Sequence, residues 1–123
     1  MDTKTEEFCE VSVTHKIDRQ TVEDLLTSAF EGGSDYWLDS AIRLVRLEGE
    51  SFIDAAFNYG LIIELAEEQK RKVMLNSYMM RHGLQVLFAR YPHHAKAIVD
   101  DNADAETADC WLQCCLFSEI VYG

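Results

Sequence analysis

The apolar residues of this chain change their spacing between its middle and its last third. In the middle, residues 41–47, 61–65 and 73–75 form short, largely apolar runs with turn signals between them, a pattern that favours strands. After Asn76 the apolar residues recur every three or four positions, which is the spacing of helices. Strands followed by helices predict an α+β domain, in which a small antiparallel sheet packs against roughly four helices.

Residues typical of helix ends locate the predicted helices. An N-cap side chain accepts a hydrogen bond from the first turn, proline suits the first helical position, and glycine often follows the last one. The sequence therefore predicts helices over 19–30 (capped by Asp18, ended by Gly32 and Gly33), from Asn76 or Ser77 to about 90, over 93–99 after Pro92, and from Asp104 or Glu106 to about 121.

Two more segments carry weaker signals. In residues 8–17, Val11 and Val13 alternate with polar residues, which predicts a further, half-buried strand. Residues 52–57 fit either a helix or a strand. The last predicted helix is expected to be amphipathic, and to bury Trp111, Leu112, Cys115, Leu116 and Val121.

Size and composition bound the class of protein. The 123 residues, 48% of them apolar, fit one compact domain over residues 1–123, since single domains cluster near this length. No run of about 18 apolar residues is present, so we expect no membrane-spanning helix. The first residues are polar and acidic, unlike a secretory signal, so we expect a cytoplasmic protein.

The net charge of −11 is unevenly distributed. Residues 1–68 hold 16 acids and 5 bases, residues 69–96 hold six bases and no acid, and residues 97–123 hold six acids and no base. A field of this sign repels nucleic acid and attracts basic protein surfaces. Direct nucleic-acid binding is therefore not expected, with the middle segment as the one possible exception.

No motif in the sequence indicates catalysis or a cofactor. Cys9, Cys110, Cys114 and Cys115 lack the paired spacing of a zinc site and are expected to be free thiols. Residues 100–106 are rich in acids but lack the glycine and glutamate of a calcium loop. No nucleophile elbow or phosphate-binding loop is present either. We therefore expect a protein that is not an enzyme and that has no cofactor and no metal.

Two stretches resemble a family of small, mostly uncharacterised proteins of bacteriophages and prophages. The first contains Glu31-Gly32-Gly33 followed by Tyr36-Trp37. The second runs from Tyr91-Pro92-His93-His94 through residues 104–109 to the Val121-Tyr122-Gly123 tail. The resemblance covers about half of the chain and is weaker between residues 48 and 72. It implies a phage origin and an accessory or counter-defence role, and it carries over no catalytic residue.

These observations lead to one main functional hypothesis and two alternatives. In the first, the protein binds and inhibits a host protein that handles nucleic acid or serves in defence (anti-CRISPR-like), with its acidic surface imitating phosphates. In the second, a nucleotide is held by the basic segment 69–96 and by the aromatic residues Tyr36, Trp37, Tyr78 and Tyr91. In the third, the last helix forms a homo-oligomer interface. The candidate partner-binding residues are Asp100, Asp101, Asp104, Glu106, Tyr36 and Trp37, although Tyr36 and Trp37 could instead anchor the core.

Overall fold

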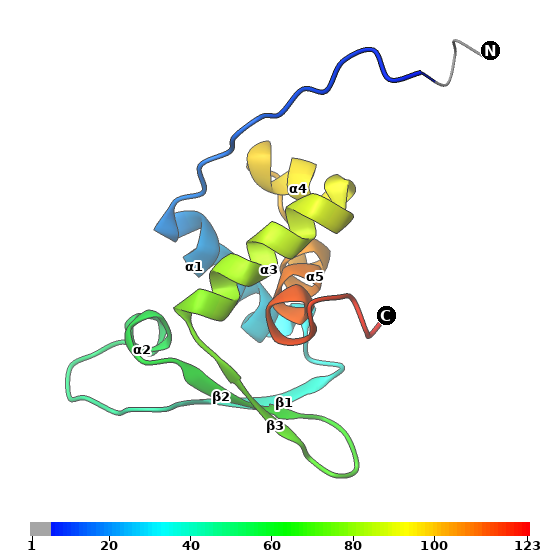
Figure 1. Cartoon of the computed structure of the whole chain (residues 1–123). Coiled ribbons are helices and arrows are strands. Elements are labelled where there is room, and N and C mark those ends of the chain that lie inside the picture. Colours follow the sequence, from blue (N-terminus) through cyan, green and yellow to red (C-terminus); the bar gives the residue numbers. More distant parts are fainter. Residues whose placement is uncertain (1–5) are drawn as a thin grey trace.

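A computed structural model describes residues 6–123 as a three-stranded antiparallel sheet with α-helices along one side of it (Figure 1). The predicted α+β class is confirmed, with five α-helices in the described part of the chain. In chain order the elements are α1 (Arg19–Ser28), the π-helical turn η2 (Ala29–Gly33), β1 (Leu38–Arg43), α2 (Phe52–Asn58), β2 (Leu61–Leu65), β3 (Lys72–Leu75), α3 (Ser77–Arg90), α4 (Pro92–Val99) and α5 (Ala105–Phe117).

The central strand of the sheet is β2, which pairs with β1 on one side and β3 on the other. Its side chains alternate in burial, with Leu61, Ile63 and Leu65 fully buried under the helices, as expected for a strand with one face on the core. The strand predicted over 61–65 is confirmed. The strand predicted over 41–47 is shifted, because β1 begins to pair at Leu38 and the chain leaves the sheet after Arg43.

The strand predicted over residues 8–17 is wrong. This segment has no regular secondary structure and extends away from the helices (Figure 1). Val11 and Val13 are 78% and 70% exposed. Only the end of the segment touches the body of the protein, where Ile17 packs on the core and the His15 ring lies 5.8 Å from that of Phe88. Alternation favours an extended backbone but does not supply a neighbouring strand, and in the described part of the chain β1 and β3 pair only with β2.

Capping side chains fix the starts of the helices, largely as predicted. Asp18, Asn76 and Asp104 each accept a hydrogen bond from the backbone N–H three residues later. Ser51 does the same for α2, which resolves residues 52–57 as a helix. A lost cap of this kind typically costs about 1 kcal/mol.

Two glycines end the first helix and let it approach the last one. Gly32 has φ 156°, outside the helical region, and terminates the π-helical turn. A Cβ atom at Gly33 would lie 2.6 Å from the carbonyl oxygen of Ala105, so only glycine allows this contact. The predicted helix stop is confirmed, and it brings the residues after Gly33 next to the start of α5.

Helix α5 is the centre of the core, not an amphipathic surface helix. Nine consecutive residues, Thr107 to Cys115, are buried. On one side α3 crosses so closely that a Cβ at Gly83 would meet the Sγ of Cys115 at 2.3 Å. The helix ends at Phe117 because Ser118 takes the left-handed conformation, and Val121 is 51% exposed. The predicted amphipathicity, the helix end near 121 and the burial of Val121 are therefore wrong. The buried residues of α5, Thr107 to Cys115, are covered by their own chain.

Candidate functional site

Three side chains from the segment after η2 converge on one carboxylate of α5. The Ser34 hydroxyl and the Trp37 indole N–H donate to Oδ1 of Asp109 at 2.9 and 2.6 Å. The Tyr36 hydroxyl donates to Oδ2 at 2.6 Å. These contacts join residues more than 70 positions apart in the chain. They hold the segment that leads into β1 against α5.

All the hydrogen-bond donors around Asp109 are neutral. The amide of Gln113, one turn along the helix, is 3.2 Å from both carboxylate oxygens. Asp109 itself is only 6% exposed. Among residues 6–123 it takes part in no ion pair. The carboxylate is therefore well supplied with hydrogen bonds, while its charge has no cationic partner in the described chain.

The same network fixes the C-terminal tail. The Gln113 amide group donates to the carbonyl oxygen of Tyr122, and its oxygen accepts from the backbone N–H groups of Val121 and Tyr122 at 2.8 and 2.7 Å. The Tyr122 ring stacks on Trp37 with the ring centroids 5.4 Å apart. The two stretches that carry the phage-family resemblance thus meet around Asp109 and Gln113.

Trp37 and Tyr36 have different environments. Trp37 is 2% exposed and belongs to the core, which favours the core-anchoring alternative over a role in binding a partner. Its indole faces Asp109 and Tyr122 because the chain turns inward after Gly33. Tyr36 is 56% exposed and keeps a surface that a partner could touch. Burial of its hydroxyl and the hydrogen bond to Asp109 raise the pKa of Tyr36 to about 12.

An open hollow lies beside this network, which we call the tail hollow. Its volume is about 450 Å³, and it is lined by Tyr36, His94, Glu106, Asp109, Cys110, Ile120, Val121, Tyr122 and Gly123. The His94 ring is positioned by a 2.9 Å hydrogen bond between Nδ1 and the Thr107 hydroxyl. Burial, with the nearby Asp109 charge, raises the pKa of the Cys110 thiol to about 11. Cys110 and Tyr36 are thus both protonated at neutral pH, and neither is an activated nucleophile.

Three of the acids predicted to bind a partner, Asp100, Asp101 and Asp104, lie between α4 and α5. The fourth, Glu106, lies in the first turn of α5, and all four are exposed. Asp104 caps α5, and the hydrogen bond from the backbone N–H of Thr107 lowers its pKa. Asp101 lies in a turn with φ 54°. One of these acids has a cationic partner, because Lys96, one helical turn before Asp100, forms an ion pair with it. The other three carboxylates have no ion pair in the described chain.

The fold brings acids of the first helix next to this loop. Asp24, Asp101 and Asp104 line one small hollow between α1 and the loop. Asp18, Asp24 and Asp101 line a second one beside it. Sequence reasoning treated Asp18 only as a helix cap and did not single out Asp24, because nothing local connects positions so far apart in the chain. We call the combined surface the acidic face: Asp18, Asp24, Asp100, Asp101, Asp104 and Glu106.

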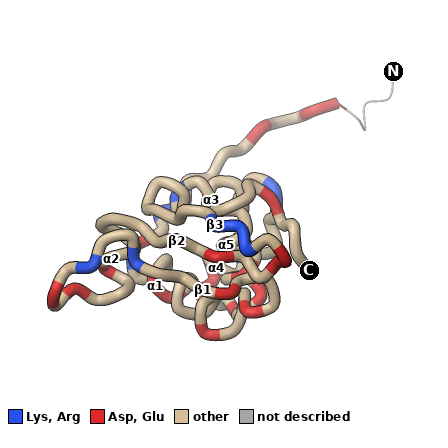
Figure 2. The backbone as a smooth tube through the Cα atoms, turned by 90° about the horizontal axis from the view of Figure 1, so that it is seen from below, with Lys and Arg blue, Asp and Glu red and all other residues tan. Residues whose placement is uncertain are grey.

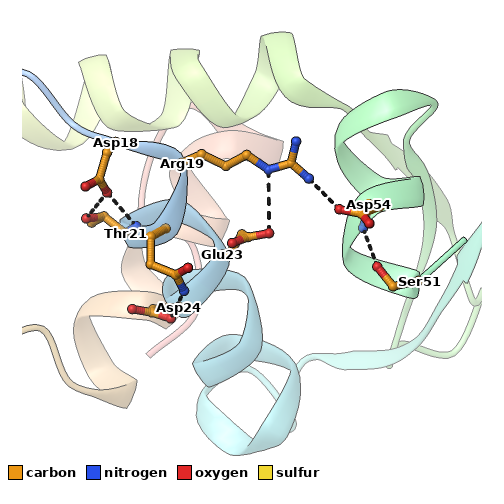
Figure 3. A network of polar contacts seen from close by, with 8 residues as sticks. Asp18, Arg19, Thr21, Glu23, Asp24, Ser51 and Asp54 are labelled. Atoms are coloured by element: carbon orange, nitrogen blue, oxygen red, sulfur yellow. Dashed lines mark hydrogen bonds and ion pairs between the residues drawn. The ribbon is translucent and has the colours of Figure 1, made fainter.

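On the other side of α1, Arg19 joins the helix to α2 (Figure 3). Its guanidinium lies 2.7 Å from a carboxylate oxygen of Asp54 and 3.5 Å from one of Glu23, and it stacks over the Phe57 ring. The backbone N–H of Asp54 donates to the Ser51 hydroxyl oxygen at 3.0 Å. The charge of Arg19 is thus already neutralised by two carboxylates, and the network reads as a structural link between α1 and α2.

The nucleotide alternative gains limited support from this region. A hollow of about 320 Å³ beside Arg19 also contains Arg81, Ser77 and Asn58. The remaining bases of segment 69–96 lie on β3 and its preceding turn, on α3 and on α4, and Figure 2 shows blue segments at β3. The basic segment does not form a single phosphate site.

The thiols and candidate metal ligands do not form a metal site in the part of the chain described. Cys9 is exposed and Cys110, Cys114 and Cys115 are buried, all as free thiols, which confirms the prediction of unpaired cysteines. Within residues 6–123 no three His, Cys, Asp or Glu side chains are placed to hold a metal ion.

No known protein family, curated protein or solved structure matches this chain. The phage-family resemblance accordingly rests on the quoted motifs alone. Along residues 6–123 no helix has both the length and the apolar character that crossing a bilayer requires.

The sequence contained one overlooked signal for the network. Asp109 is the only charged residue between positions 107 and 118, a run that is otherwise apolar or neutral. An acid in such a run is either exposed on a polar face or buried with partners. Because the helix was expected to be amphipathic, Asp109 was not singled out, and Gln113 was passed over with it.

Proposed function

We propose that this protein is a non-enzymatic phage or prophage accessory protein that binds a basic surface of a host protein through its acidic face. One observation supports this most directly. Carboxylates from α1 and carboxylates of the loop between α4 and α5 line the same two adjacent hollows. A basic channel that normally holds nucleic acid, in a nucleic-acid-handling or defence protein of the host cytoplasm, is the kind of surface this face would occupy.

The physical argument rests on long-range attraction. The acids are exposed, and Asp104 and Asp18 are kept ionised because hydrogen bonds from Thr107 and Thr21 lower their pKa values. Exposed charges add little to the stability of the fold, and their main effect is on association with a partner of opposite sign. The net charge of −11 adds to this attraction over the whole surface.

The site chemistry also favours binding over catalysis. The thiols of Cys110 and Cys114 and the phenol of Tyr36 all have raised pKa values, whereas an activated nucleophile or base needs a pKa near neutrality. The polar side chains around Asp109 are used in holding the β1 entry and the tail in place.

Comparative capture from a bacterial host lysate tests this proposal. The wild type is compared with the variant Asp100→Asn, Asp101→Asn, Asp104→Asn, Glu106→Gln. Asparagine still caps α5 at position 104 and tolerates the positive φ at 101. The control neutralises four exposed acids elsewhere: Glu10, Glu31, Glu48 and Glu68, each to Gln. We expect a partner that is captured by the wild type and the control and lost from the loop variant. Equal capture by all three proteins would contradict the proposal.

A small anionic ligand is the second candidate. The observation that favours it is the exposed Arg81 in the hollow beside Arg19. Equilibrium dialysis against nucleotides, with Arg81→Gln as the comparison, tests it. Retention of a nucleotide that depends on Arg81 would support this alternative.

A further inference from the structure

The tail hollow contains a buried carboxylate that has no counter-ion among residues 6–123. Asp109 is 6% exposed and forms one wall of the hollow. Its hydrogen-bond donors are hydroxyl, indole and amide groups. Buried charges in proteins are normally paired with an opposite charge. Neutral donors solvate the carboxylate but do not cancel its electric field. The low-dielectric protein around it screens this field less than water would.

Other groups around the hollow add to this field or suit a flat cation. Glu106 lies three residues before Asp109 on α5, so the two acids occupy the same side of the helix. Tyr36 and Tyr122 contribute aromatic rings, and aromatic rings attract cations at their faces. The hollow has no lysine or arginine among its lining residues. Its volume of about 450 Å³ lies within the usual range of ligand pockets, about 300–1,000 Å³.

We propose that the tail hollow binds the guanidinium group of an arginine side chain, supplied by the basic protein partner. The guanidinium is planar and weakly hydrated, stacks on aromatic rings and forms paired hydrogen bonds with carboxylates, whereas an ammonium is compact and strongly hydrated. This inference rests on the proposed function, because it names the partner's anchoring residue. Glu106 connects the two surfaces, since it belongs to the acidic face and also lines the hollow.

Arginine anchors often carry much of the binding energy of an interface when they enter a preformed pocket. The tail hollow is preformed because Gln113 holds the backbone of Val121 and Tyr122, and Trp37 supports the Tyr122 ring. The exposed acids would then accelerate encounter, while the hollow would fix the orientation of the partner.

Binding of a small probe tests the inference without the partner. N-acetyl-arginine methylamide, which has a single positive charge, is titrated into the full-length ¹⁵N-labelled protein. The matched probe is the citrulline analogue, which has the same shape without the charge. We expect the arginine probe to shift the backbone amide signals of Asp109, Gln113 and Tyr122, with a dissociation constant in the millimolar range. The citrulline probe should not shift them.

Two variants make the assignment specific. Glu106→Gln should weaken arginine binding severalfold, whereas Glu68→Gln, an equal charge change between β2 and β3, should leave it unchanged. Three results would overturn the inference: equal shifts with both probes, equal weakening by both variants, or no shifts with the arginine probe at roughly 20 mM, well above a dissociation constant of about 1 mM.

The proposal for the acidic face can fail separately. The variant Asp100→Asn, Asp101→Asn, Asp104→Asn keeps Glu106 and the hollow intact. If it loses the captured partner while the wild type fails to bind the arginine probe, only the present inference is wrong. If the probe binds as described but the wild type and this variant capture the partner equally, the acidic-face proposal is wrong and the inference about the tail hollow stands.

Discussion

Replacing Asp109 should destabilise the fold far more than replacing any exposed acid. In Asp109→Ala the hydroxyl of Ser34 and the indole N–H of Trp37 lose their acceptor, and the amide of Gln113 loses one of its acceptors. Ser34, Trp37 and Gln113 are buried, so these donors cannot all turn to water. A buried donor left unpaired costs about 1–3 kcal/mol, and removing one partner of a buried charged network about 3–5 kcal/mol.

Relief of the buried charge offsets part of this cost. We therefore expect Asp109→Ala to lower the free energy of unfolding by about 3 kcal/mol, a large share of the 5–15 kcal/mol typical of a domain. Asp109→Asn keeps one acceptor oxygen for Ser34 and Trp37 and should lose about half as much. Trp37→Phe retains the ring that stacks on Tyr122 and removes a single hydrogen bond, at a cost of about 1–2 kcal/mol.

Urea denaturation followed by far-ultraviolet circular dichroism measures these differences, with Glu68→Gln as the exposed control. The order of stability should be control, then Trp37→Phe and Asp109→Asn, then Asp109→Ala. A loss below 1 kcal/mol for Asp109→Ala would refute the reasoning, because it would mean that the donors find other partners or that the network adds nothing to the fold.

Three other predictions follow from the core and the network. Gly83→Ala should destabilise the fold by about 2 kcal/mol, because overpacking against Cys115 outweighs the roughly 1 kcal/mol gained in helix propensity; a stabilised variant in the same urea assay would contradict the close crossing of α3 and α5. Leu112→Ala should cost about 2–5 kcal/mol, and Leu116→Ala, at a half-buried position, clearly less; the reverse order would contradict the burial pattern of α5. The raised pKa of Tyr36, about 12 against 10 for an ordinary tyrosine, means that the unfolded chain loses this proton first, so stability should fall as pH rises from 10 to about 12. Tyr36→Phe should show a shallower fall in its urea midpoint over this range, and equal slopes would remove Tyr36 from the network.

The sequence predicted well those features that are decided locally. Asp18, Asn76 and Asp104 cap their helices because a short side chain reaches the first turn from its own position. Residues 61–65 form β2, since alternating burial requires only that one face meets the core. These signals were enough for the α+β class.

Features decided by distant contacts were missed. Residues 8–17 alternate like a strand but have no neighbour to pair with, and residues 107–115 are buried all round because α3 crosses α5 at Gly83. The Asp109 network joins positions 34–37 to 109–113 and 122, a separation that no periodicity reveals. The same holds for the acidic face, where Asp24 of α1 lies beside Asp101 of a loop far along the chain.

The central claim is that the acidic face recognises a basic partner. The most direct measurement is the association rate of the captured partner at several salt concentrations, for the wild type and for the variant with Asp100, Asp101 and Asp104 changed to Asn and Glu106 to Gln. Screening shortens the reach of exposed charges from about 30 Å at 0.01 M salt to about 8 Å at 0.15 M. We predict that the wild-type rate falls steeply with salt, and that the variant associates more slowly with a much flatter dependence. The same rate and the same salt slope in both proteins would contradict the account.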